Sequence, residues 1–278
     1  MSTSPNRPPF DSNRAWSDAV AMVSANREVL AALAGVFLVV PAFAIATLLP
    51  PPEPQDGATM EAMFATMGEY YRSNILVLVG MALLHMIGGL AMLALFTDDR
   101  RPTVGEAIRQ GFQRTPTVIA AQLILGAGIG AMVLLPVTLG GAAQSPGFSL
   151  LALLAAAGLG IWAWTRLSLI SPAVMVERLG NPIAAMKRSW SLTEGNALRL
   201  LAFYVLVGIA FGVVVVLAEG ATRLVVTLLA GDRPGDIVGL LASSLMQAAM
   251  TVYFVAISAA AHRQLAGPST QSVVDKFE

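Results

Sequence analysis

The chain has 278 residues, of which 56% are hydrophobic and only 12% are charged, and its mean hydropathy is +0.70. A soluble domain carries about 25% charged residues, so this composition excludes an ordinary water-soluble protein and predicts a membrane protein. Lys+Arg and Asp+Glu balance at 17 each, which gives no indication of nucleic-acid binding. Cysteine is absent, which excludes disulfides, thiolate metal sites and a cysteine nucleophile.

The N-terminal segment is polar, and we expect residues 1–15 to be a flexible cytoplasmic tail. The first apolar run, 29–49, has 21 residues and would span about 31 Å as a helix, which matches a bilayer core. A cleaved signal peptide is the alternative, because Ala42-Phe43-Ala44 resembles a cleavage site. However, the polar lead is too long and the run exceeds the usual hydrophobic region of about 7–15 residues. We therefore expect a retained first span.

Five further apolar runs predict membrane-spanning helices, at about 75–96, 116–139, 148–176, 197–218 and 237–261. The fourth run has 29 residues and exceeds one bilayer crossing, so we expect it to tilt or emerge, with Pro172 bending its last turns. The fold class predicted is an all-α integral membrane protein with six transmembrane helices and short amphipathic interfacial helices. Residues 16–263 would form this single domain, and 264–278 a second flexible cytoplasmic tail.

Two shorter amphipathic helices are predicted between the early spans. Residues 60–71 place methionine and aromatic side chains on one face, which is typical of a helix lying on the outer membrane surface. Thr103 and Glu106 match a capping box that opens a second amphipathic helix. Pro116 would then occupy the first turn of the third span, so we expect a break before it.

The best-formed amphipathic segment is 177–199, between the fourth and fifth spans. Asn181 and Pro182 fit the cap and first turn of a helix that ends near 193–195. Asn196 can then cap the fifth span. This helix carries basic residues beside an apolar face, which is typical of a membrane surface or docking helix.

Basic residues indicate the orientation. The segment before the first span, the segments 97–115 and 177–199, and the segment after the sixth span together hold 13 Lys and Arg residues, whereas the opposite loops hold three, Arg72, Arg223 and Arg233. By the positive-inside rule, both termini are expected to be cytoplasmic.

The amphipathic segments also resemble one another. Residues 185–190 align with 107–112 and, more faintly, with 19–24, and each of these precedes a membrane hairpin. Spans two apart point the same way, so the pattern favours three parallel repeats of an amphipathic helix plus a hairpin. The alternative is that any amphipathic helix before a span looks similar.

Arg166 is the most informative single residue, because it lies ten residues before the end of the fourth run, about 15 Å along the helix. An arginine at that depth costs at least about 2.5 kcal/mol, so it should face protein or water. It is either an interhelical clamp or a site for an anionic headgroup or substrate.

The lone His85 in the second span has no carboxylate within any span, so packing is a better interpretation than proton relay. Candidate lipid or partner contacts are Arg166, Glu177, Arg178, Lys187, Arg188, Trp190 and Asn196.

Residues 171–178 (SPAVMVER) and 184–196 (AAMKRSWSLTEGN) resemble a bacterial group. They are similar to the membrane domain of glycerophosphoryl diester phosphodiesterase-type proteins and of related uncharacterised six-span inner-membrane proteins. The resemblance implies a multi-pass protein of the bacterial inner (plasma) membrane. Nothing in the chain corresponds to the catalytic barrel that some of those proteins carry, so phosphodiesterase activity is not implied.

The sequence shows no phosphate-binding glycine loop, serine-elbow motif, zincin helix or paired-carboxylate site. We therefore predict a non-enzymatic protein without catalytic, cofactor-binding or metal-binding residues. The leading hypothesis is a membrane scaffold or accessory protein whose cytoplasmic amphipathic helices bind membrane lipids, a protein partner or a second copy of the chain. The alternative is a transporter or channel for a lipid or small amphiphile, with Arg166 as an anion site.

Overall fold

The computed structural model describes residues 9–53, 57, 59–98, 102–142 and 146–267, and every regular element in this part of the chain is a helix. Six segments are long and apolar enough to cross a membrane: Arg27–Leu48, Met60–Thr97, Val104–Leu135, Leu150–Val176, Ala197–Ala230 and Asp232–Ala266. The predicted all-α, six-span architecture is therefore confirmed. Of the flexible tails predicted over 1–15 and 264–278, residues 1–8 and 268–278 lie outside the described residues.

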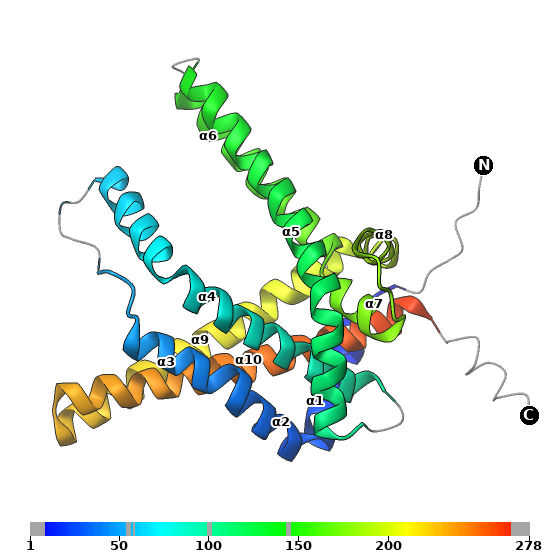
Figure 1. Ribbon diagram of the computed structural model, residues 1–278, viewed down its shortest axis with the longest axis horizontal. Helices are drawn as coiled ribbons and strands as arrows, with labels where there is room; N and C mark the ends of the chain where they lie inside the picture. The colour runs from blue at the N-terminus through cyan, green and yellow to red at the C-terminus, as the bar shows by residue number, and fades with distance from the viewer. Residues whose placement is uncertain (1–8, 54–56, 58, 99–101, 143–145, 268–278) are drawn as a thin grey trace, which may run out of the picture.

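The spans form three hairpins. The first pairs α2 (Arg27–Ala34), the π-helical turn η1 (Gly35–Val39) and α3 (Val40–Leu48) with α4 (Met60–Thr97). The second pairs α5 (Val104–Ala142) with α6 (Pro146–Arg166), and the third pairs α9 (Ala197–Ala230) with α10 (Asp232–Ala266). In Figure 1 the hairpins diverge from one end that also holds α1 (Ser12–Ala25), α7 (Ile170–Val176) and α8 (Pro182–Leu192). We call this the convergent end.

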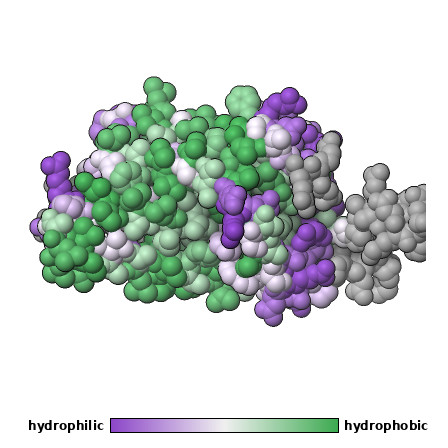
Figure 2. Space-filling model, turned by 90° about the horizontal axis from the view of Figure 1, so that it is seen from below, coloured by the Kyte–Doolittle hydropathy of each residue, from purple (hydrophilic) through white to green (hydrophobic). Residues whose placement is uncertain are grey.

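The outer surface of the hairpins is largely apolar. Figure 2 shows hydrophobic side chains over the flank of the molecule and hydrophilic ones gathered at the two extremities, with the larger group next to the chain termini. Large apolar side chains on the spans are exposed, such as Leu206 at 66% and Leu228 at 76%. In water such a surface would be unstable, so the exposed faces are those that contact lipid.

Two predicted breaks between an amphipathic helix and the span after it are absent, because α4 and α5 are each continuous. Residues 60–71 are the first turns of α4, which begins after the cap Thr59 and runs for 38 residues. The prediction of a separate helix on the outer membrane surface was therefore wrong. No glycine or proline lies between Tyr71 and the second span to stop the helix.

The helix α5 likewise runs through Pro116. The capping box is confirmed, since the Thr103 N–H donates to Glu106 Oε2 at 2.8 Å and the Glu106 N–H to the Thr103 hydroxyl at 3.4 Å. The proline removes one backbone donor, yet the helix on either side of it stays continuous. Gly111 allows α5 to lie directly against α4 in this region, where an added Cβ would be 2.9 Å from the Ile87 carbonyl oxygen. This contact holds α5 against α4 little more than one turn before the proline.

We call each amphipathic segment together with the hairpin that follows it a repeat unit. Each amphipathic segment packs against the last helix of the preceding unit, and that of the first unit packs against the last helix of the third. The helix α1 packs on α10, where Trp16 stacks on Tyr253 with ring centroids 5.5 Å apart. The first turns of α5 pack on α4, and α8 packs on α7. The three alanines that the sequence repeat aligns, Ala19, Ala107 and Ala185, are each 0% exposed. This shared burial supports the repeat.

The second and third units share a further detail. Asp98 is the C-terminal cap of α4, and Glu177 is the C-terminal cap of α7. Gln110 donates to Asp98 at 3.5 Å and Arg188 donates to Glu177 at 2.8 Å, and the repeat aligns these two donors. The same position of each amphipathic helix therefore contacts the end of the helix beneath it.

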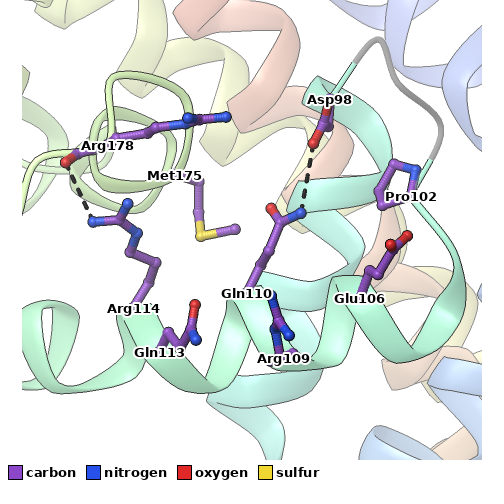
Figure 3. A pocket seen from close by; sticks show the side chains of 9 residues that line it. All are labelled: Asp98, Pro102, Glu106, Arg109, Gln110, Gln113, Arg114, Met175 and Arg178. Atoms are coloured by element: carbon purple, nitrogen blue, oxygen red, sulfur yellow. Dashed lines mark hydrogen bonds between the residues drawn. The ribbon is translucent and has the colours of Figure 1, made fainter.

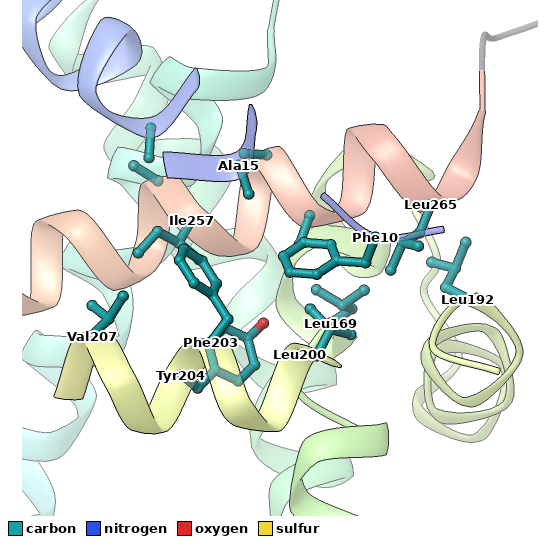
Figure 4. Close-up of a cluster of buried hydrophobic side chains, with 14 residues drawn as sticks. Phe10, Ala15, Leu169, Leu192, Leu200, Phe203, Tyr204, Val207, Ile257 and Leu265 are labelled. Carbon is teal, nitrogen blue, oxygen red and sulfur yellow. The ribbon is translucent and has the colours of Figure 1, made fainter. Parts of the chain in front are cut away.

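The ordered structure begins earlier than residue 16. Phe10 is 5% exposed and inserts beside Phe203, with ring centroids 5.7 Å apart, in the cluster drawn in Figure 4. Its N–H donates to Asn196 Oδ1 at 2.8 Å. Asn196 is the N-terminal cap residue of α9, but its side chain makes no capping hydrogen bond there. The predicted side-chain cap was wrong, because this amide holds the N-terminal segment instead.

Candidate functional site

The fourth apolar run is broken three residues before Pro172. The helix α6 ends at Arg166 and α7 begins at Ile170, so the predicted single helix with a late bend was wrong. A proline lacks its own N–H and its ring clashes with the carbonyl four residues earlier, here that of Ser168. The break therefore lies upstream of the proline. Arg166 is the last residue of α6, rather than a residue in the middle of a continuous span.

Hydroxyl groups of α8 satisfy the backbone at this break. The Ser189 hydroxyl accepts from the Leu169 N–H at 3.1 Å and donates to the Arg166 carbonyl oxygen at 2.9 Å. The Thr193 hydroxyl also lies 3.1 Å from the Arg166 carbonyl oxygen. A break in a buried helix leaves such groups without partners inside the helix, so α8 supplies them from the side.

The Arg166 side chain is 7% exposed and lies against two indole rings. Its Cζ is 4.6 Å from the ring centroid of Trp190 and 5.7 Å from that of Trp162. The two rings meet edge to face at 4.8 Å. A desolvated cation–π contact contributes about 2 kcal/mol. Of the two interpretations of Arg166, this geometry favours the interhelical clamp, with tryptophan rings as partners that the sequence did not identify.

Glu177 and Arg188 contact each other. The Arg188 Nε lies 2.8 Å from both carboxylate oxygens of Glu177, and His262 Nε2 lies 3.0 Å from Glu177 Oε1. His262 is 3% exposed at the end of α10, so the carboxylate joins α7, α8 and α10. No sequence pattern pointed to His262 beyond its position directly after the sixth span. By contrast, His85 was expected to pack inside the bundle but is exposed.

The outward face of α8 carries an exposed apolar side chain and an exposed basic one. Ile183 is 54% exposed, and Lys187, one turn later, is also exposed. Asn181 accepts from the N–H groups of Ile183 and Ala184, which confirms the predicted cap of this helix. We call Ile183 and Lys187 the α8 outer face.

A polar pocket of about 450 Å³ lies at the convergent end, between the end of α4, the first turns of α5 and the end of α7. Figure 3 shows its lining: Asp98, Pro102, Glu106, Arg109, Gln110, Gln113, Arg114, Met175 and Arg178. Three guanidinium groups and two carboxamides thus surround one cavity. Of these, only Arg178 was among the predicted contacts. Arg109 and Arg114 meet it only because α7 folds back onto α5, which no local sequence pattern indicates.

The Arg178 backbone adopts a left-handed conformation, with φ of 53°. Its carbonyl oxygen accepts from Arg114 Nη1 at 3.2 Å, which joins α5 to the segment after α7. Such a conformation costs about 1–2 kcal/mol in a residue other than glycine. The fold therefore holds Arg178 in place against a local conformational preference. Chemically, the pocket suits an anionic group.

The matched family covers nearly all of this architecture. No curated protein and no solved structure matches the chain. Residues 13–265, from α1 to the last turn of α10, match the family described as domain of unknown function DUF7847. The chain, with its six apolar spans, therefore belongs to the DUF7847 family.

Proposed function

We propose that this protein is a non-enzymatic scaffold or accessory protein of the bacterial inner membrane, with both termini cytoplasmic, and that it binds membrane lipid through its convergent end. The α8 outer face carries this proposal. Arg188 and Trp190 contact Glu177 and Arg166, respectively, whereas Ile183 and Lys187 present an apolar and a basic side chain outward. This combination is typical of helices that lie at an anionic membrane surface.

The orientation is supported by charge. The segments that form the convergent end hold most of the basic residues, and basic residues accumulate on the cytoplasmic side. The even balance of total charge gives no support for a nucleic-acid partner.

The resemblance to the membrane domain of glycerophosphoryl diester phosphodiesterase-type proteins fits the same proposal. The residues of that signature have structural tasks here, since Trp190 covers Arg166, Ser189 bridges the break after α6, and Arg188 binds Glu177. These contacts account for the residues of the signature by their structural tasks, without a catalytic role.

A transporter that uses Arg166 as its anion site is less well supported. The side chain is 7% exposed and stacked on Trp190, so an anion has no direct approach to its guanidinium. This arrangement is that of a structural anchor.

The α8 outer face is tested by purifying the protein in native membrane patches and identifying the lipids and proteins that accompany it. We expect Ile183→Gln/Lys187→Gln to lower the share of anionic lipid about fivefold, since one basic residue near an anionic surface contributes about 1 kcal/mol. The control Leu228→Gln/Arg233→Gln changes exposed residues at the opposite end. If the variant loses an accompanying protein while its lipids stay the same, the α8 outer face docks a protein partner and does not bind lipid. If neither the lipids nor the proteins change, the proposal is refuted.

A further inference from the structure

We propose that the pocket between α4, α5 and α7 binds the phosphate of an anionic phospholipid headgroup. This inference rests on the proposed lipid binding and assigns it to a second, distinct site. Arg109, Arg114 and Arg178 supply the cationic groups, and Gln110 and Gln113 supply further hydrogen-bond donors. Guanidinium groups bind phosphate oxygens through paired, charge-assisted hydrogen bonds.

The charges of this pocket favour an anion. No carboxylate in the described ranges forms an ion pair with Arg109, Arg114 or Arg178. Elsewhere in the fold Arg188 and Arg263 each contact one, Glu177 and Asp18 respectively.

The two acidic residues of the pocket already have partners. Glu106 Oε2 accepts from the N–H and the hydroxyl of Thr103, at 2.8 and 3.0 Å, to cap α5. Asp98 accepts from Gln110. The guanidinium groups thus outnumber the carboxylates, and Glu106 is committed to the helix start.

The pocket is built by tertiary contacts rather than by mobile surface side chains alone. Arg114 is half-buried and donates to the carbonyl oxygen of Arg178, whose backbone is held in the left-handed region. Residues held in such conformations concentrate at binding sites, because the surrounding structure has to maintain them. The cavity volume of about 450 Å³ lies within the range of small-molecule sites.

The surroundings favour a lipid over free phosphate as the source of the anion. Met175 adds an apolar side chain to the lining. Beside the pocket on α5, Phe112 is 65% exposed, and Ile124 is 45% exposed about three turns beyond Gln113. A phospholipid with its phosphate in the pocket can therefore lay its acyl chains along the exposed apolar side of α5.

The test uses the full chain in vesicles of phosphatidylcholine containing a minor share of phosphatidylglycerol, followed by extraction and native mass spectrometry of the retained lipids. The wild-type chain should retain phosphatidylglycerol preferentially. Arg109→Gln/Arg178→Gln should lower this retention about tenfold or more, because hydrogen bonds to charged groups are lost. The matched control is Arg14→Gln/Arg199→Gln, which removes two exposed arginines of the same end outside the pocket and should leave retention unchanged.

Gln113→Glu serves as a second variant that should not disturb folding, since this exposed side chain keeps its size and gains only a negative charge. It should also lower retention. Equal retention in both pocket variants and the wild type would overturn the inference, while a loss confined to Ile183→Gln/Lys187→Gln would leave the proposed function standing without the pocket. Inorganic phosphate at millimolar concentration should not displace the lipid. If it does so completely, the pocket is a free-phosphate site and the lipid assignment is wrong.

Discussion

Ser189 shows how one side chain can support a broken membrane helix. Its hydroxyl accepts from the Leu169 N–H and donates to the Arg166 carbonyl oxygen, the two groups that the break after α6 leaves without intrahelical partners. A buried N–H without a partner costs about 1–3 kcal/mol. The residue is 0% exposed, so water cannot take over these hydrogen bonds.

We expect Ser189→Ala to lower the free energy of unfolding by about 1–3 kcal/mol, because the Leu169 N–H loses its acceptor. Unfolding of the purified protein in mixed micelles with increasing denaturing detergent measures this change. Ser24→Ala is the control, since the Ser24 hydroxyl is exposed and contacts only the Ala21 carbonyl of its own helix. Equal stability of the two variants would show that Ser189 does not support the break.

Trp190 allows a second test at this scale, because its ring lies over the Arg166 guanidinium. Trp190→Phe keeps an aromatic face, whereas Trp190→Leu removes it. We expect the leucine variant to be less stable than the phenylalanine variant by about 1 kcal/mol, because a phenylalanine ring makes a weaker cation–π contact than the tryptophan ring does. The same unfolding assay compares them, and indistinguishable midpoints would mean that the ring acts by its volume alone.

At the scale of elements, the close approach of α4 and α5 depends on Gly111. A Cβ at this position would lie 2.9 Å from the Ile87 carbonyl oxygen and 3.0 Å from the Ala91 nitrogen, and both are backbone atoms of α4. Glycine alone does not indicate such a contact. Gly126 and Gly130 are spaced four residues apart on α5, a spacing that lets helix backbones approach closely, yet neither has a described atom within 4 Å of an added Cβ.

Gly111→Ala should therefore destabilise the protein by about 1–3 kcal/mol, since the two helices have to separate. Gly105→Ala, on the same helix, is the matched control, because no described atom lies within 4 Å of the added Cβ. There we expect a neutral or slightly stabilising effect of about 0.5 kcal/mol from the lower entropy of the unfolded chain. Thermal unfolding in detergent measures both, and a Gly111→Ala variant as stable as the control would contradict this packing.

For the whole molecule, the orientation in the membrane is the property to measure. The chain contains no cysteine, so single cysteine variants carry no labelling background. In intact cells with a permeable outer membrane, a membrane-impermeant maleimide should label Asp232→Cys but not Lys187→Cys. After the inner membrane is opened, both exposed positions should react. Labelling in the reverse order would place the convergent end outside the cytoplasm.

The sequence by itself determined the all-α class, the number of spans, the capping box at Thr103 and the helix start at Asn181. These features follow from hydrophobic run length and from hydrogen bonds between near neighbours, both of which are local. The repeat could also be seen locally, and the burial of Ala19, Ala107 and Ala185 supports it.

Only the tertiary structure decided which residues meet. Trp190 lies over Arg166, His262 contacts Glu177, and Phe10 donates to Asn196, which is 186 positions away in the sequence. Likewise, α5 continues through Pro116, and Gly111 lets it lie directly against α4 close to that proline. The pocket arginines come together because α7 folds back onto α5 after the break at Arg166. Such contacts depend on helix packing over long sequence separations, and the pattern of any single segment does not contain that information.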